Sequence, residues 1–340
     1  MAISLTHHLG CLRRFPCHNP HQFRCLSTTT QSTPPTLRRS YLYVPASNDR
    51  MLQKSLTSSS DVIIYDLEDS VPPSAKDKEG ARERLIGFLQ SSLGPARVAV
   101  RVNDVTTRFF EDDVHRVLQS PLIGTLVLPK IHSAEDLHRV SHAIHSATRS
   151  SPSRVDGIPL KIVSSVESAR ALWDLGRIAS WKSQHGEALG GVLSALLFAA
   201  EDYCADTSII RTSSLRELLY TRSQVVIAAK AFGLEAIDMV CINYKEPEVL
   251  QRECRDGREL GFTGKQAIHP AQVEIIQSTF VPTSKEILRA AKILRQMDES
   301  HASGLGAAGL DGEMIDAPMI KQAEKVIQIA KAAGLEIPNV

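Results

Sequence analysis

Short apolar runs alternate with longer amphipathic stretches along most of the chain. The runs are four to seven residues long and rich in Val, Ile and Leu, as expected for strands buried on both faces. A repeated order of strand and then helix predicts a parallel sheet built from βα units. The eight expected strands are Tyr41–Val44, Val62–Leu67, Val98–Val102, Thr125–Leu128, Leu160–Val163, Leu193–Phe198, Ala236–Ile242 and Lys265–Ile268.

Helical patterns fill the segments between these runs, for instance at Ala75–Leu89, Ala134–Ser146 and Glu167–Ile178. The clearest predicted helix covers Leu215–Phe232, which consists of good helix formers. Ser214 and Glu217 have the spacing of a capping box and predict its N-terminus. Gly233 supplies a natural C-terminal stop.

Eight βα units predict a TIM (β/α)8 barrel over residues 39–300. A doubly wound open sheet is the alternative, but no GxGxxG motif follows the first strand, which disfavours a dinucleotide-binding sheet. Two further helical segments follow the eighth strand, at Pro270–Ser278 and Ser284–Met297. Residues 301–340 contain a linker of small residues at 303–309 and a last amphipathic helix, which predicts a C-terminal helical extension that packs on its own barrel or on a neighbour's.

The first 48 residues have a different composition from the rest. They contain no Asp or Glu, five arginines and two clusters of Ser and Thr. An acid-free segment rich in Arg and Ser is typical of a mitochondrial transit peptide, so we expect residues 1–38 to be one, cleaved between Leu26 and Arg38. The expected location is therefore the mitochondrial matrix. A disordered basic tail with no targeting role has the same composition.

Overall composition narrows the classes of partner. The 340 residues carry 39 Lys and Arg against 38 Asp and Glu, so we expect no nucleic-acid partner. No apolar stretch approaches the length that a bilayer requires, so we expect no membrane partner. The six cysteines lack CxxC spacing, which argues against a disulfide framework or a structural zinc site. His138 and His142 lie four apart, but polar neighbours indicate a solvated helix face.

Polar side chains follow every expected strand at its C-terminal end, where TIM barrels place their active sites. A single residue of this kind usually caps a helix, whereas a complete ring is hard to explain by packing. The ring comprises Tyr43, Asp66, Glu68, Asp69, Arg101, Asn103, Lys130, Glu167, Glu201, Asp202, Asn243 and His269.

Two carboxylates of this ring predict a metal site. Glu167 and Asp202 end adjacent strands, and two like charges held together need a cation. A site with few protein carboxylates, completed by water and substrate oxygens, is typical of Mg²⁺. We expect Asp66, Glu68 and Asp69 to contact metal-bound water. Helix capping could account for Asp69 but not for all three.

The basic residues of the ring allow more than one interpretation. Arg101 suits bidentate binding of a substrate carboxylate, and an ion pair with the acidic cluster is compatible with that role. Lys130 could form a Schiff base, but the carboxylates around it favour a charge partner. Arg50 and Lys54 share one helical face, where they meet a phosphate of a large substrate or are simply solvated.

Ordered motifs along the mature chain resemble the citrate lyase β-subunit-like group of the HpcH/HpaI aldolase family. The likeness runs from about Arg39 to the last helix and is greatest for the mitochondrial branch of that group. The motifs are Leu42–Pro45, Arg50–Lys54, Tyr65–Val71, Arg101–Asn103, Leu128–Lys130, Val166–Ala169, Ala200–Asp202, Ala229–Gly233, Gly261–Pro270 and Met314–Pro318.

The resemblance implies a TIM barrel that uses Mg²⁺ to cleave a carbon–carbon bond in a 3-hydroxy-acyl-CoA with a second carboxylate, such as citramalyl-CoA or malyl-CoA. It also implies a homo-oligomer, commonly a trimer in which the C-terminal segment reaches a neighbour's active site. Residue by residue, it implies metal ligands at Glu167 and Asp202, CoA-side contacts at Tyr43, Arg50 and Lys54, a substrate arginine at Arg101, pocket residues at Ile268 and His269, and a catalytic carboxyl group at Asp316.

The expected reaction follows from these roles. Asp316 removes the proton of the substrate hydroxyl, and Arg101 stabilises the enolate that forms when acetyl-CoA separates from a 2-oxoacid. The alternatives are a malyl-CoA thioesterase and a CoA-ester-binding subunit without turnover. The chain departs from the family pattern at Ala46 and at Ala199–Ala200, where Gly is usual, and the extra methyl groups leave the size of the substrate open.

Overall fold

A computed structural model of the chain describes residues 36–90, 97–150, 158–302, 308–310 and 312–340. The expected transit peptide, residues 1–38, therefore lies almost entirely outside the described residues. Residues 36–38 are described. The Arg38 guanidinium forms a 2.9 Å ion pair with Glu235, and the Arg39 side chain pairs with Asp61 at 2.8 Å.

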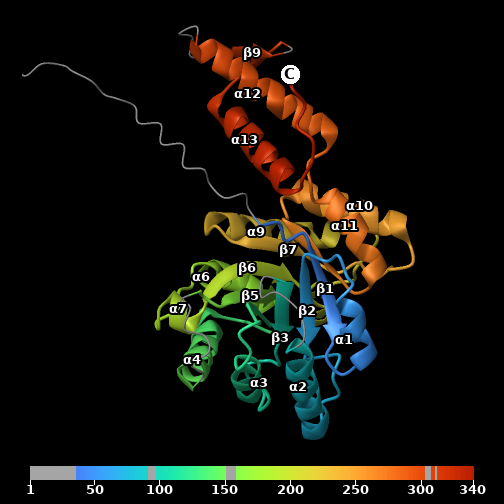
Figure 1. The fold of residues 1–340 in the computed structure, drawn as a ribbon, viewed down its shortest axis with the longest axis vertical. Helices are drawn as coiled ribbons and strands as arrows, with labels where there is room; N and C mark the ends of the chain where they lie inside the picture. The colour runs from blue at the N-terminus through green and yellow to red at the C-terminus, as the bar shows by residue number, and fades with distance from the viewer. Residues whose placement is uncertain (1–35, 91–96, 151–157, 303–307, 311) are drawn as a thin grey trace, which may run out of the picture. The chain divides into compact units, whose positions relative to one another are not determined.

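Eight parallel strands form a closed barrel in the order β1 to β8, which confirms the predicted TIM-barrel fold (Figure 1). Strand β1 pairs with β2 on one side and with β8 on the other, which closes the sheet. The strands are β1 (Ser40–Pro45), β2 (Val62–Asp66), β3 (Val98–Arg101), β4 (Thr125–Leu128), β5 (Lys161–Val166), β6 (Val192–Phe198), β7 (Glu235–Asp238) and β8 (Gly264–Ala267).

Helices connect successive strands and cover the outside of the barrel (Figure 1). They are α1 (Asp49–Ser55), α2 (Ala75–Leu89), α3 (Phe110–Val117), α4 (Ala134–Ser150), α5 (Ala169–Trp173), α6 (Leu175–Ala179), α7 (Glu187–Gly190), α8 (Ala200–Thr207), α9 (Leu219–Ala231), α10 (Pro247–Leu260) and α11 (Val273–Thr279), with short 3₁₀ helices η3 (Arg216–Leu218) and η4 (Pro270–Gln272). In the described part of the chain, no helix has the length and apolar character that a membrane crossing requires.

The strands bury both of their faces, as the continuous apolar runs predicted. Alternate residues such as Ile63 and Tyr65 pack with the helices in the larger core. Their neighbours, including Ile64, Val127 and Ile237, form a second cluster that fills the barrel lumen. The lumen is therefore packed mostly with apolar side chains.

Two predicted helices differ from the structure. The capping box at Ser214 does not form, because the Glu217 carboxylate instead accepts the backbone N–H and the hydroxyl of Thr212, at 2.7 and 2.9 Å. Leu215 takes a left-handed conformation with φ 55°, and the α-helix starts only at Leu219. The helix predicted at 167–178 is divided into α5 and α6 at Asp174, which ends one and begins the other.

The C-terminal extension contains helix α12 (Ser284–Ala302), a hairpin of β9 (Ala308–Leu310) and β10 (Glu313–Ile315), and helix α13 (Ala317–Ala332). Its apolar side chains form a small core of their own, composed of Ala290, Ile293, Met297, Ile315 and Ala323. Helix α12 supplies three of these residues, so it packs with the predicted extension. The boundary predicted at residue 300 stays a prediction.

Candidate active site

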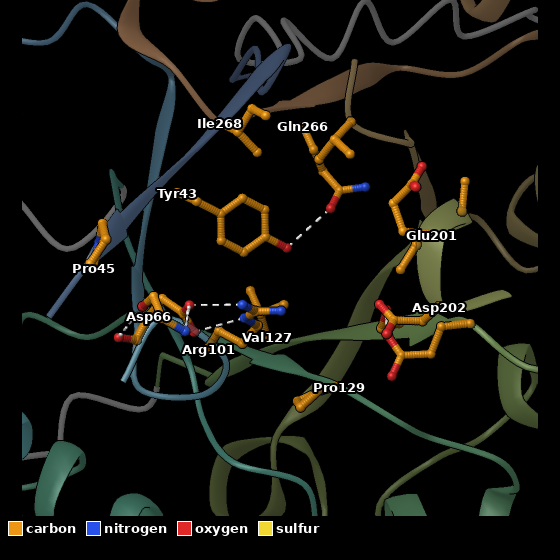
Figure 2. Close-up of a pocket in the computed structure, with 16 residues that line it drawn as sticks. Tyr43, Pro45, Asp66, Arg101, Val127, Pro129, Glu201, Asp202, Gln266 and Ile268 are labelled. Carbon is orange, nitrogen blue, oxygen red and sulfur yellow. Dashed lines mark hydrogen bonds and ion pairs between the residues drawn. The ribbon is translucent and has the colours of Figure 1, made fainter. Parts of the chain in front are cut away.

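A cavity of about 200 Å³ opens among the residues that end the barrel strands (Figure 2). Acidic, basic and amide side chains from different strands face it. Six of the twelve residues of the predicted ring line it: Tyr43, Asp66, Arg101, Glu167, Glu201 and Asp202. The cavity is lined by Tyr43, Pro45, Asp66, Ser70, Arg101, Val127, Pro129, Ser165, Glu167, Ala199, Ala200, Glu201, Asp202, Val240, Gln266 and Ile268.

Glu167 is a buried carboxylate held at a defined angle. It follows β5 directly and is 5% exposed. Its Oε1 accepts the backbone N–H of Lys130 at 2.6 Å, and its Oε2 accepts the Ser165 hydroxyl at 2.8 Å. Burial, together with the negative charges of Asp202 and Glu68, raises the pKa of Glu167 to about 7 against these two hydrogen bonds. Each oxygen retains lone pairs that a cation can use.

Asp202 brings a second carboxylate to the same cavity. It lies in the first turn of α8, just after β6, where the positive end of the helix dipole favours a negative charge. Figure 2 shows Glu201 and Asp202 on the side of the cavity away from the Asp66–Arg101 pair. The cavity thus combines an acidic side with a charged guanidinium.

Arg101, at the end of β3, is fixed by carboxylates. Its Nε and Nη2 donate to the two oxygens of Asp66 at 2.8 and 2.7 Å (Figure 2). Its Nη1 lies 2.9 Å from Glu68 and 3.5 Å from Asp69. Burial disfavours the charged form, but the hydrogen bonds and charge of Asp66 outweigh it and raise the pKa of Arg101 well above its usual range. Arg101 therefore remains a cation with a fixed orientation.

The acidic loop after β2 rests on buried donors. The Lys78 ammonium donates to the carbonyl oxygens of Leu67 and Glu68, both at 2.8 Å. The Asn103 amide also donates to Leu67, at 3.0 Å, and is itself held by Asp113. Asn103, which was expected at the rim, is thus buried, and it holds the backbone of the loop through the Leu67 carbonyl oxygen. The contact of the loop's carboxylates with metal-bound water stays a prediction, since the partners described for them are Arg101, Lys130 and the backbone N–H groups of Glu68 and Ser70.

Lys130 is a charge partner and not a free amine. Its ammonium donates to Glu68 Oε1 at 2.5 Å. Burial lowers its pKa, but the hydrogen bond and the charge of Glu68 outweigh burial and raise it above its usual value. A Schiff-base lysine needs the opposite shift, because only the neutral amine attacks a carbonyl. The geometry therefore disfavours a class I aldolase.

Gln266 is a cavity residue that sequence reasoning missed. Its Nε2 donates to the carbonyl oxygens of Phe198 and Asp238 at 2.9 and 3.0 Å, and its Oε1 accepts the Tyr43 hydroxyl at 3.1 Å (Figure 2). Arg101 lies 4.9 Å from the centre of the Tyr43 ring, within cation–π range. Burial raises the pKa of Tyr43, so its hydroxyl keeps its proton. The only sequence signal for Gln266 was an amide inside an otherwise buried strand.

Comparison with known proteins identifies the family of the chain. The family described as HpcH/HpaI aldolase/citrate lyase matches residues 39–270. The chain belongs to this family. It is 33% identical over 297 residues to the human mitochondrial citramalyl-CoA lyase, covering 86% of this chain and 85% of that protein. It is 30% identical to the citrate lyase subunit beta of Leuconostoc mesenteroides subsp. cremoris, covering 88% and 95%.

Solved structures agree with the sequence comparison. Protein CitE of Mycobacterium tuberculosis, in complex with magnesium, acetoacetate and coenzyme A, superimposes with a TM-score of 0.67. It is 27% identical, and the match covers 88% of this chain and 98% of that one. Membership of the HpcH/HpaI family, with lyases among its relatives, makes the chain a carbon–carbon lyase.

Other residues expected in the site of an HpcH/HpaI lyase are spread more widely. Ile268 lines the cavity. Its neighbour His269 instead begins η4, where its Nδ1 accepts the N–H of Ala271, and its ring stacks on Tyr244. Arg50 and Lys54 lie on the exposed side of α1, four residues apart, and are not among the described residues that line the cavity.

Asp316 lies in the C-terminal extension. It is the N-cap of α13, and its Oδ1 accepts the N–H of Met319 at 3.0 Å. The side chain is exposed, and Asp316 is not among the described residues that line the cavity of its own chain. Its expected catalytic role stays a prediction.

Proposed function

We propose that the chain is a Mg²⁺-dependent lyase that cleaves citramalyl-CoA or malyl-CoA into acetyl-CoA and a 2-oxoacid. The observation that carries this proposal is one cavity at the C-terminal ends of the barrel strands that is lined by Glu167, Asp202 and Arg101. The human relative is named for citramalyl-CoA, and a structural relative was crystallised with magnesium and coenzyme A. Both support the assignment.

The cavity suits a magnesium ion held by Glu167 and Asp202. The raised pKa of Glu167 reports a buried charge that lacks a full counter-charge, and a cation supplies one. The described residues contain no cluster of three or more His, Cys, Asp or Glu side chains able to hold a metal. Two carboxylates leave the remaining positions to water and substrate oxygens, as Mg²⁺ prefers. When bound, the ion supplies Lewis acidity that lowers the pKa of the substrate hydroxyl.

Two side chains then carry out the proton transfer and the stabilisation of negative charge. The hydroxyl proton of the substrate passes to the Asp316 carboxylate, and the electrons of the O–H bond form the carbonyl of the 2-oxoacid. The electrons of the broken carbon–carbon bond move into the thioester, and protonation of the resulting enolate gives acetyl-CoA. Arg101 stabilises the negative charge that develops, because its guanidinium is already oriented before the substrate binds.

The CoA portion of the substrate needs contacts outside the cavity. We propose that Arg50 and Lys54 meet its phosphates, since both are exposed on one side of α1. Tyr43, which lines the cavity near the end of β1, the strand that precedes α1, is the third proposed CoA-side contact. Neutralising either basic residue should weaken CoA-ester binding, increasingly so at low ionic strength, where charge contributes most.

The decisive experiment is an assay of the purified protein with citramalyl-CoA and with malyl-CoA, with and without Mg²⁺. Mass spectrometry should find acetyl-CoA with pyruvate from the first or glyoxylate from the second, and EDTA should stop both reactions. Free CoA with malate would identify a thioesterase instead. Full turnover in EDTA would refute the metal assignment, and binding without turnover would indicate a CoA-ester-binding subunit.

We also propose that the enzyme works in the mitochondrial matrix as a homotrimer. The acid-free, Arg-rich composition of residues 1–48 supports the location, as do the mitochondrial names of the human, rat and mouse relatives. The exposed position of Asp316 supports the assembly, since a base in the extension can serve a cavity of another copy.

A further inference from the structure

Lys130 has an unusual backbone conformation. In the described part of the chain, three residues other than glycine have a positive φ: Lys130 at 51°, Ser208 at 60° and Leu215 at 55°. An L-residue adopts this left-handed conformation only where its surroundings hold it, since Cβ crowds the carbonyl oxygen. Such residues gather at functional sites. Lys130 is the one of the three that contacts a cavity carboxylate.

The conformation turns the Lys130 N–H toward Glu167. The donor follows Pro129, which lines the cavity, and lies 2.6 Å from Glu167 Oε1. Together with the Ser165 hydroxyl on Oε2, it fixes both oxygens of the carboxylate. A short hydrogen bond from a main-chain donor to an ionised group is directional and strong. The orientation of Glu167 thus depends on φ at residue 130.

The Lys130 side chain performs a separate task. Its ammonium pairs with Glu68, which also pairs with Arg101. Glu68 and Glu167 repel each other, as the contribution of Glu68 to the raised pKa of Glu167 indicates. A glycine would adopt the same backbone without strain but would leave Glu68 without its lysine partner. One residue therefore connects two carboxylates, one through its backbone and one through its ammonium.

We propose that Lys130 is a positioning residue that acts through its main chain, its left-handed conformation aiming an N–H at Glu167 and so setting the geometry of the cation site. The proposal rests on the proposed function in one respect, the binding of a divalent cation at Glu167. It assigns the ammonium to Glu68 and gives it no part in orienting Glu167.

The test compares two variants that both lack the ammonium. Lys130→Gly keeps the left-handed conformation, whereas Lys130→Val opposes it, because β-branched residues rarely have a positive φ. Calorimetric titration of the metal-free protein with Mg²⁺ and with Mn²⁺ should give an affinity for the Val variant at least about tenfold weaker than for the Gly variant, the range seen when groups behind a metal ligand are altered.

Ser208 provides the matched control. It has the same conformation at the C-terminal end of α8 and does not line the cavity. Ser208→Gly and Ser208→Val should bind the cations equally well. If Lys130→Val fails to fold, Lys130→Asn and Lys130→Thr repeat the comparison, because Asn tolerates a positive φ and Thr does not.

The outcomes separate this proposal from the proposed function. Equal cation affinity in the Gly and Val variants, with a wild type that binds, would refute the role of the Lys130 backbone and leave the metal site standing. A wild type that binds neither cation would refute the proposed function itself. A loss of affinity as large in the Gly variant as in the Val variant would assign the effect to the ammonium, against the proposal.

Discussion

At the scale of single residues, Glu167 determines how the energy of the site depends on pH. In the folded chain without a cation it keeps its proton up to about pH 7, whereas its ordinary pKa is 4.5. Between these values the folded state binds more protons than the unfolded state, so stability falls as pH rises. This loss of folding free energy is complete above about pH 7 and amounts to roughly 3 kcal/mol. Above pH 7 the buried charge of Glu167 therefore destabilises the metal-free protein, and a bound cation would offset that loss.

Replacing Glu167 by Gln should remove this pH dependence. We expect metal-free Glu167→Gln to resist urea about as well as the wild type at pH 4.5 and to be more stable than it at pH 8, because the amide never ionises. Urea denaturation of both proteins in EDTA at several pH values measures the difference. Added Mg²⁺ should stabilise only the wild type at pH 8. A difference in unfolding free energy between the two proteins that stays constant from pH 4.5 to 8 would contradict the burial of the Glu167 charge.

Single residues were also where sequence reasoning succeeded and failed most clearly. The shared position of Glu167, Asp202 and Arg101 at one cavity could be predicted, because each follows an apolar run and parallel strands end at one rim. Gln266 could not, since its importance lies in three hydrogen bonds to distant segments. The backbone role of Lys130 was equally hidden, because no local pattern marks a positive φ at a lysine.

At the scale of elements, a buried ionic network joins β7 and β8 to α9 and α10. Asp238 is fully buried and accepts Nε and Nη2 of Arg222 at 3.1 and 2.9 Å, with the Lys265 ammonium 3.5 Å away. Burial alone would raise the pKa of Asp238, but the charges of Lys265 and Arg222 lower it. Glu253 of α10 lies 3.2 Å from the same ammonium. Buried charges are tolerated here because each lies within 4 Å of an opposite charge.

Breaking this network should loosen the barrel where β7 and β8 meet their helices. Asp238→Asn removes the fully buried carboxylate that Arg222 and Lys265 share, so Arg222 keeps only the half-exposed Asp256 and Lys265 keeps only Glu253. We expect a loss of up to roughly 3–5 kcal/mol of stability. The matched control is Glu135→Gln, which removes an ion pair with Arg177 on the surface and should change stability little. Equilibrium denaturation measures both. Equal small effects would mean that water reaches the network.

Elements were predicted unequally well for a physical reason. The strands were found because parallel strands of a barrel are buried on both faces and read as continuous apolar runs. The helix start at Ser214 was wrong because Glu217 bonds to Thr212, a competing local contact that leaves Leu215 in a left-handed turn. A capping motif in the sequence shows which side-chain hydrogen bonds can form. Competing local contacts determine which of them does form.

At the scale of the whole molecule, the start of the mature chain is testable. Arg38 and Arg39 are tied to the barrel by Glu235 and Asp61, so removal of Arg38 would cost contacts of the folded body. We expect N-terminal sequencing of the protein from isolated mitochondria to find a first residue between 27 and 38. Full-length protein beginning at Met1 as the main species, outside mitochondria, would contradict both the transit peptide and the proposed location.

The assembly can be tested by mixing two inactive subunits. Asp316→Ala and Glu167→Gln should each lack activity when expressed alone. When they are expressed together, some cavities would combine an intact Glu167 with an intact Asp316 from a neighbour, so partial activity should return. Mass spectrometry of the intact oligomer checks that mixed trimers form. Mixed trimers without activity would mean that Asp316 serves the cavity of its own chain or is not the base.

The packed lumen beneath the cavity makes it a dead end. Ile64, Val127 and Ile237 fill the barrel below, so no molecule reaches the cavity through the barrel lumen. If the CoA portion lies outside the cavity, as proposed, we expect the 2-oxoacid to form beneath the thioester. We then expect the smaller product to leave after acetyl-CoA in cleavage and to enter before it in condensation. Because the barrel is closed below the cavity, we expect an ordered reaction. Acetyl-CoA would be the first product to leave in cleavage and the last substrate to enter in condensation.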